Sequence, residues 1–138
     1  MIELELASER HIQALDLTDR IIDRDYPDGF LWLGCPHTTA ALIVCEADAE
    51  MLADVETVAG GLLTGFTPFQ HHKNDNPNGA AHLFSSLAGT QLLLPVVKGR
   101  VQLGTYQRIV FVELDGPRQG RRVQLESLAR EPLAAADA

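Results

Sequence analysis

The feature that most limits how this chain can fold is a pair of apolar segments, residues 30–35 and 40–45, joined by four residues. The second segment has no polar side chain before Glu46. Continuous apolar segments of this length are typical of central strands that are covered on both faces. Neither approaches the roughly twenty apolar residues that are needed to cross a bilayer. We therefore expect a sheet-based fold without a membrane-spanning segment.

The remaining strands are expected from alternation of apolar and polar side chains. Ile2, Leu4 and Leu6 alternate with acidic residues, which indicates a half-buried strand at the start of the chain. Further strands are expected over residues 12–17, 91–97, 100–104, 107–114 and 122–128.

Two main helices interrupt this series of strands. Apolar residues at helical spacing predict helices over residues 48–63 and 79–87, with Asn78 capping the second, and Thr18 is placed to cap a short additional helix. Strands, two helices and then strands predict an α+β domain, which we assign to residues 1–130. Residues 131–138 are expected to be a frayed tail. The apolar strands exceed what two helices cover, which favours contacts with other copies of the chain.

Composition restricts the function classes. The net charge of −8 and the pI near 4.9 argue against nucleic acid or an anionic membrane as partner, because phosphates would be repelled. Two cysteines do not form a disulfide framework, and the N-terminus lacks the basic start of a signal peptide, so we expect a cytoplasmic protein. Five of the eleven basic residues lie within residues 100–122, which leaves room for a local basic pocket that binds a small anion.

Histidines are concentrated in one short segment. Residues 71–82 contain His71, His72 and His82 together with Asn74 and Asp75. Neutral imidazoles bind metals, and histidine titrates near neutral pH, so the cluster indicates a site. Three imidazoles from this segment and from position 37 would suit zinc or a similar ion, although their spacing is not a known zinc signature. The alternative is a polar loop of solvated histidines.

Other candidate residues lie at the ends of the expected strands and helices. His37 and Thr38 join the two apolar strands, either as a site or as a simple turn. Glu46 is either an acid at a helix start or an acid/base group. Ser85 and Ser86 share a helix face with His82 and would bind a metal or a phosphate, unless they only bond back to helical carbonyls.

Two residues of the second half are candidates for binding substrate. The planar guanidinium of Arg100 matches a phosphate or carboxylate, and Gln107 offers hydrogen bonds next to Gly104. A nucleophile at Cys35 or Cys45 is a competing hypothesis, but thiols in apolar strands are usually inert.

These motifs occur together, in this order, in one known family. The chain resembles the YjbQ-like family, labelled secondary thiamine-phosphate synthase. The motifs that carry the resemblance are His37-Thr-Thr-Ala40, Glu46, His71 with the Asn-Asp-Asn stretch, His82-Leu-Phe-Ser-Ser86, Gly89, Leu94-Pro95, Gly99-Arg100 and Gly104-Thr-Tyr-Gln107. The resemblance covers almost the whole chain.

The resemblance implies a fold, an assembly and a reaction. The fold is a β-rich α+β domain of two packed sheets, sandwich-like, with two main helices, assembled as a homotrimer. The reaction joins a pyrimidine diphosphate to a thiazole phosphate and releases pyrophosphate. The family's metal or anion site corresponds to His37, His71 and His82 in this sequence. The family's asparagines beside the acid are Cys45 and Ala47 here, and its G-T-W-Q tryptophan is Tyr106, which puts the substrate in doubt.

We therefore expect a metal-binding enzyme, with zinc as the first choice of metal, that acts on a small anionic, phosphorylated metabolite. The expected catalytic residues are Glu46 and His82. The expected substrate-binding residues are Thr38, Ser85, Ser86, Arg100 and Gln107. The alternative is a non-catalytic trimer that binds a metal or a metabolite.

Overall fold

Two antiparallel sheets packed face to face form the body of the molecule. The computed structural model describes residues 1–71 and 77–134. The larger sheet has the order β1 (Ile2–Leu6), β8 (Arg121–Leu128), β3 (Gly29–Gly34), β5 (Gln91–Val97) and β6 (Arg100–Val101). The smaller sheet has the order β2 (Gln13–Asp16), β7 (Arg108–Glu113) and β4 (Ala40–Cys45).

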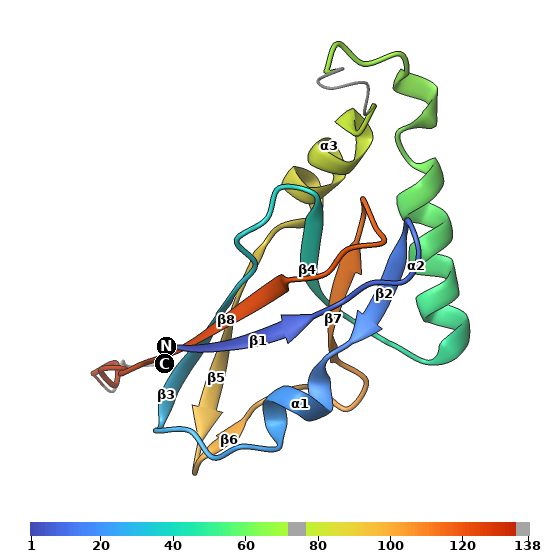
Figure 1. The fold of residues 1–138 in the computed structure, drawn as a ribbon. Coiled ribbons are helices and arrows are strands. Elements are labelled where there is room, and N and C mark those ends of the chain that lie inside the picture. Colours follow the sequence, from blue (N-terminus) through green and yellow to red (C-terminus); the bar gives the residue numbers. More distant parts are fainter. Residues whose placement is uncertain (72–76, 135–138) are drawn as a thin grey trace.

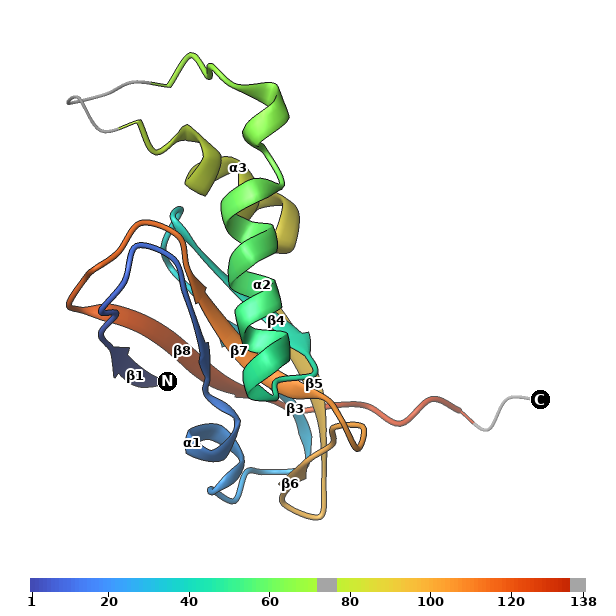
Figure 2. The ribbon, with the colours of Figure 1, turned by 90° about the vertical axis from the view of Figure 1, so that its right-hand side faces the viewer.

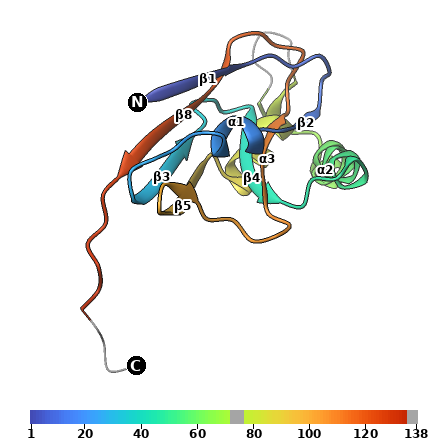
Figure 3. The same cartoon turned by 90° about the horizontal axis from the view of Figure 1, so that it is seen from below.

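Two helices, α2 (Ala49–Gly61) and α3 (Gly79–Ala88), cover the outer face of the smaller sheet. The short helix α1 (Thr18–Ile22) contributes Ile21 to the core between the sheets, and the 3-10 turn η1 (Thr64–Phe66) follows α2. α2 packs against β2, and α3 packs against β4 (Figures 1 and 2). The view along the molecule shows three layers, with α2 outside the smaller sheet and the larger sheet on the other side (Figure 3). This confirms the expected α+β fold of two packed sheets with two main helices. None of the helices in the described part of the chain is long and apolar enough to span a membrane.

The four central residues of β7, positions 109–112, are all apolar because both faces of the strand are covered. Ile109 and Phe111 face the larger sheet and belong to the core between the sheets. Val110 and Val112 point the other way, into a second core beneath α2 and α3. All four side chains are fully buried, because a strand sends alternate residues to opposite faces and both faces of β7 are covered.

β4 differs in one respect from the expectation of a central strand. Ala40, Ala41 and Leu42 are buried on both faces, as expected, but β4 lies at an edge of the smaller sheet. α3 covers the outer face of β4, and at the strand's edge the backbone N–H of Leu42 donates to the carbonyl of Gly89 at 3.0 Å. The apolar sequence of β4 therefore predicted its burial correctly, but not its position at the edge of the smaller sheet.

The helix ends contain two further corrections. Asp48 caps α2 by accepting a hydrogen bond from the backbone N–H of Met51 at 2.7 Å. Asn78 precedes α3 as expected, but its side chain makes no capping bond and donates instead to Asp115. Thr18 does not cap α1 either: it is the first helical residue, and both its N–H and its hydroxyl donate to Asp16.

The hairpin between β5 and β6 is set by its turn residues. Lys98 and Gly99 both have positive φ, at 52° and 79°, the conformation of a tight two-residue hairpin turn. The strand that follows is only Arg100–Val101, shorter than the expected 100–104. Beyond β8, residues 131–134 are exposed and outside any helix or strand, while residues 135–138 of the expected tail lie outside the described part.

Candidate functional site

A pocket opens where β3 ends, β4 begins and α3 runs into β5. Its volume is about 350 Å³. The residues that line it are Cys35, Pro36, His37, Thr38, Ser85, Ser86, Gly89 and Thr90. Four of these were expected site residues from two distant parts of the sequence, and the fold brings them together: His37, Thr38, Ser85 and Ser86. We call this the His37 pocket.

Hydrogen bonds to backbone carbonyls hold the walls of the His37 pocket in place. The hydroxyl of Ser85 is buried and donates to the carbonyl of Ala40 at 2.6 Å, which ties α3 to the start of β4. The N–H of Cys35 donates to the carbonyl of Thr90 at 2.8 Å, which ties β3 to the start of β5. Ser86 bonds back to the carbonyl of His82, the alternative that the sequence left open for the serines.

His37 is half-buried and has one nitrogen already occupied. Its Nε2 accepts a hydrogen bond from the backbone N–H of Arg122 at 3.0 Å. A neutral imidazole that accepts at Nε2 carries its proton on Nδ1, so the free nitrogen is a donor. Burial lowers the pKa of His37, and the positive charges of Arg121 and Arg122 lower it further, so the neutral form is favoured. His37 is thereby suited to donate a hydrogen bond to an anion.

A buried ion pair supports the turn that carries His37. The carboxylate of Glu113 is fully buried and pairs with the guanidinium of Arg121, whose Nε donates to Oε1 at 2.9 Å. Arg121 also donates to the carbonyl and hydroxyl of Thr39, at 3.1 and 2.8 Å. Ser8 and the backbone N–H groups of residues 114 and 115 complete the bonds to Glu113. The turn over residues 37–39 is therefore fixed from beneath.

This ion pair was not predicted from the sequence. Glu113 ends the buried strand β7, directly after four apolar residues, and Arg121 begins the next strand. That position is a usable signal, because a charge at a buried strand end needs a partner. That Glu113 pairs with Arg121 depends on the path of the loop between β7 and β8, and their separation in the sequence does not reveal that path.

Three arginines lie near the His37 pocket, and each is paired with a carboxylate: Arg118 with Asp115, Arg121 with Glu113 and Arg122 with Glu3. Arg118, Arg121 and Arg122 all act on His37, with Glu113 as the opposing charge. Among the described residues that line the His37 pocket there is no carboxylate. An imidazole N–H and hydroxyl donors, without a carboxylate in the lining, suit a small anion.

Two of the three predicted metal ligands, His71 and His82, lie side by side. The rings of His71 and His82 lie with their centroids 4.8 Å apart, edge to face at 70°. His37 would join them only by giving up its bond from the Arg122 N–H. Within residues 1–71 and 77–134, no group of three or more His, Cys, Asp or Glu side chains is arranged to hold a metal. His72, Asn74 and Asp75 lie outside the described residues.

Two expected site residues, Glu46 and Gln107, lie at the other end of the smaller sheet from the His37 pocket. Glu46 directly follows β4, whose start carries the His37 turn, and a strand of this length spans roughly 20 Å. Gln107 lies beside Glu46, because the neighbouring residues Cys45 and Arg108 pair across the strands. Gln107 accepts a hydrogen bond from the N–H of Gly104 at 2.7 Å. Within one copy, neither residue joins the His37 pocket.

Arg100 is also remote from the pocket. β5 begins beside the pocket at Gln91, and Arg100 follows the turn at the far end of that strand. Its guanidinium is exposed and lies 3.9 Å from Asp25. The competing hypothesis of a cysteine nucleophile is not favoured, since burial raises the pKa of the thiols of Cys35 and Cys45 and keeps them protonated.

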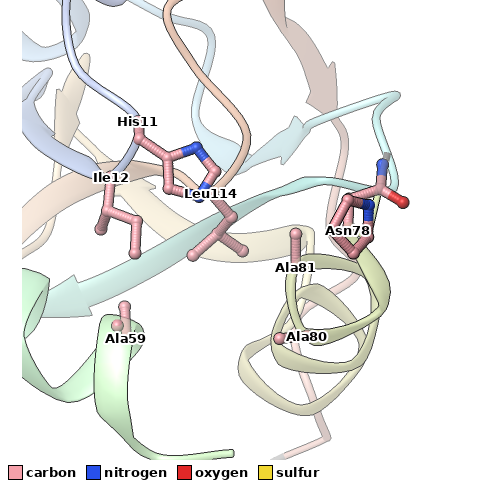
Figure 4. Close-up of a pocket in the computed structure, with 9 residues that line it drawn as sticks. His11, Ile12, Ala59, Asn78, Ala80, Ala81 and Leu114 are labelled. Atoms are coloured by element: carbon pink, nitrogen blue, oxygen red, sulfur yellow. The ribbon is translucent and has the colours of Figure 1, made fainter. Parts of the chain in front are cut away.

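A second pocket of about 340 Å³ lies between α2 and α3, over the smaller sheet (Figure 4). Its floor is apolar, with Ile12, Ala59, Ala81 and Leu114, and His11 lies at its edge. The ring of His11 contacts the carbonyl of Gly116 through Nδ1 at 3.3 Å. Sequence reasoning assigned no role to this region.

Comparison with known proteins gives one consistent family. The sequence model described as UPF0047 protein YjbQ-like matches residues 2–130. A UPF0047 protein of Archaeoglobus fulgidus is 36% identical over 129 residues, covering 92% of this chain and 100% of that protein. The UPF0047 protein YugU of Bacillus subtilis is 31% identical, over 83% of this chain and 89% of its own length. The crystal structure of a hypothetical protein from Aeropyrum pernix K1 superposes with a TM-score of 0.82 at 36% identity, covering 93% of this chain and 97% of that one.

Proposed function

This chain belongs to the UPF0047 family of YjbQ-like proteins, and from that premise we propose that it is an enzyme that binds a small phosphorylated metabolite in the His37 pocket. The candidate reaction is the synthesis of thiamine phosphate, with the cytoplasm as its setting. The observation that carries the proposal is the character of the pocket. In a chain with a net charge of −8, its lining combines an imidazole and hydroxyls without a carboxylate, close to arginines.

The residues of the pocket would bind the pyrophosphate that leaves in that reaction. When a pyrimidine diphosphate is joined to a thiazole phosphate, the bond to the diphosphate breaks and pyrophosphate departs with the electron pair. A hydrogen bond from Nδ1 of His37 to a phosphate oxygen would stabilise the negative charge that develops. Thr38 is exposed at the pocket edge and would supply a second donor. Arg121 would act indirectly, because its hydrogen bonds to Thr39 hold the turn that carries His37 and Thr38.

A divalent metal, zinc first, remains part of the proposal and would be held by His71 and His82. If bound, it would act as a Lewis acid on a phosphate oxygen. Elemental analysis of the protein purified without a histidine tag tests this. About one metal per chain in the wild type, lost in His82→Ala, is expected, and no metal in either protein would remove it from the proposal.

We propose that the chain assembles as a homotrimer and that each active site is shared between copies. The support is the separation of Glu46, Arg100 and Gln107 from the His37 pocket within one copy. Residues that act together but lie at opposite ends of one chain must meet across an interface. Mixing His37→Ala chains with Gln107→Ala chains would then restore activity, because some shared sites would be intact. Mixtures no more active than the separate variants would contradict the shared site.

The binding step is tested by a pair of variants that differ mainly in charge. Thr38→Asp places a carboxylate in the His37 pocket, and Thr38→Asn places a neutral group of similar size there. Because Thr38 is exposed, both variants should fold. Calorimetric titration with inorganic pyrophosphate should show binding to the wild type and Thr38→Asn and a loss of at least tenfold in Thr38→Asp. Equal affinities in all three would refute the anion pocket.

Turnover separates an enzyme from a binding protein. The wild type is expected to form thiamine phosphate from the pyrimidine diphosphate and the thiazole phosphate, and His82→Ala should reduce the rate. Pyrophosphate binding without product, under any added divalent metal, would leave the non-catalytic metabolite-binding protein as the better description.

A further inference from the structure

The second pocket, between α2 and α3, is lined by none of the residues that the sequence predicted for a site. We call it the α2–α3 pocket. It lies where β7, the middle strand of the smaller sheet, ends beneath the space between a helix packed on β2 and a helix packed on β4. Small residues line this space from both helices: Ala59, Gly60, Ala80 and Ala81. Because protein interiors are normally close-packed, a space of about 340 Å³ that larger side chains could fill needs a reason to remain open.

The α2–α3 pocket is apolar inside and polar only at its rim. Leu114, which directly follows β7, and Ala81 are its buried floor residues, while Ile12 and Ala59 are half-buried. His11 is exposed at the edge (Figure 4). No carboxylate, lysine or arginine is among the described residues that line the pocket. The lining therefore suits an uncharged ligand whose apolar end is directed inward.

His11 gives the rim one hydrogen-bond acceptor in a fixed position. Its Nδ1 lies 3.3 Å from the carbonyl oxygen of Gly116, and since a carbonyl only accepts, Nδ1 carries the proton. In the neutral ring Nε2 is then an acceptor, and Figure 4 shows this nitrogen on the side of the ring toward Leu114. The backbone is also held, because the N–H of Gly116 donates to the carbonyl of His11 at 2.9 Å. A ligand in the pocket would therefore meet an acceptor at its outer end.

We propose that the α2–α3 pocket binds a small uncharged alcohol or phenol. Its apolar body would lie against Leu114 and Ala81, and its hydroxyl would donate to Nε2 of His11. A cavity of roughly 150 Å³ already admits benzene, so the larger volume here is sufficient for a substituted ring. The α2–α3 pocket shares no lining residue with the His37 pocket. The site therefore goes beyond the proposed function and does not depend on it.

The test compares two ring compounds that differ in one hydrogen-bond donor, 4-ethylphenol and 4-ethylanisole, each titrated into the protein and followed by NMR. In the wild type, 4-ethylphenol should shift the methyl signals of Ile12, Ala59 and Ala81 and the ring signals of His11. The anisole lacks the hydroxyl proton and should bind roughly three- to tenfold more weakly, the range that one neutral hydrogen bond supplies. In His11→Phe, which keeps a ring but removes the acceptor, the two compounds should bind equally.

Two leucine variants of α2 locate the site. Ala59→Leu places a larger side chain in the pocket and should abolish the shifts caused by 4-ethylphenol. Ala53→Leu is the matched control, because Ala53 is exposed on the same helix and does not line the pocket, so the variant should bind as the wild type does. Circular dichroism confirms that each variant is folded.

The site is overturned if 4-ethylphenol shifts none of these signals, or if the wild type binds the two compounds equally. Shifts at His37 in place of His11, or unchanged binding in Ala59→Leu, would overturn it as well. Pyrophosphate binding to the His37 pocket is measured separately, so failure of the proposed function and failure of this site are distinguishable.

Discussion

Replacement of Arg121 by Met tests how the His37 turn is held. The variant removes all four hydrogen bonds from the guanidinium, two to Glu113 and two to Thr39. Glu113 keeps bonds from Ser8 and two backbone N–H groups, but its charge remains buried without a counterion. Breaking a buried ion pair on one side costs roughly 3–5 kcal/mol. The remaining bonds to Glu113 place the expected loss near the lower end, about 3 kcal/mol at pH 7.

Urea unfolding at several pH values measures this loss and tests its cause. Burial alone would raise the pKa of Glu113, but hydrogen bonds from Arg121 and Ser8 outweigh it and hold the pKa below its usual value. In the wild type, the carboxylate therefore contributes stability above its unfolded pKa and loses it as the pH falls through the folded pKa. In Arg121→Met, burial dominates and the pKa rises, so protonation relieves the unpaired charge. The difference between the two proteins should shrink as the pH falls from 7 toward 4.

An exposed ion pair in the same chain is the matched control. Arg10 and Glu56 are joined by two hydrogen bonds, at 2.9 and 3.0 Å, but the arginine side chain is 59% exposed. Arg10→Met should cost far less than Arg121→Met, because solvent screens such exposed pairs. The same loss in Arg10→Met and Arg121→Met, or a loss in Arg121→Met that does not change with pH, would refute the argument that Glu113 is left as an unpaired buried charge.

Three further changes are predicted for the scaffold, each measured by urea unfolding. Phe111→Ala, in the core between the sheets, should cost roughly 3–5 kcal/mol, and a cost below 1 would contradict tight packing there. Asp48→Ala removes the cap bond to the Met51 N–H and should cost about 1 kcal/mol, with Asp48→Asn nearly neutral. Ser85→Ala leaves the buried carbonyl of Ala40 without its hydroxyl donor and should cost roughly 1–3 kcal/mol, and no change would mean that water replaces the hydroxyl.

Side-chain periodicity was sufficient to predict most of the fold. The strand over residues 91–97 has the expected bounds, and the helix expected over residues 48–63 is present as α2 (Ala49–Gly61). The edge position of β4 was not predictable, because side-chain pattern reports whether the two faces of a strand are covered and not whether a strand pairs along each edge. The resemblance to the YjbQ-like family is confirmed over residues 2–130.

The candidate site was predictable in part, for a physical reason. Four predicted site residues meet because the segment between β3 and β4 lies beside the C-terminal half of α3: His37, Thr38, Ser85 and Ser86. The sequence placed each of them near the end of an expected strand or in an expected helix. The sequence does not show which end of the fold a given turn occupies. Glu46 was therefore predicted to lie in the same site as His37, although β4 places it at the other end of the smaller sheet. The catalytic, substrate and metal roles of these residues remain predictions.

The most direct test of the account is histidine-ring NMR during titration with pyrophosphate, with signals assigned by His→Gln variants. His37 lines the proposed anion pocket, and His11 lines the second pocket between α2 and α3 (Figure 4). The account predicts that the Nδ1–H signal of His37 is present before titration and shifts on addition of pyrophosphate, while the ring signals of His11 stay unchanged. Shifts at His11 alone, or no shift at any histidine, would contradict anion binding in the His37 pocket.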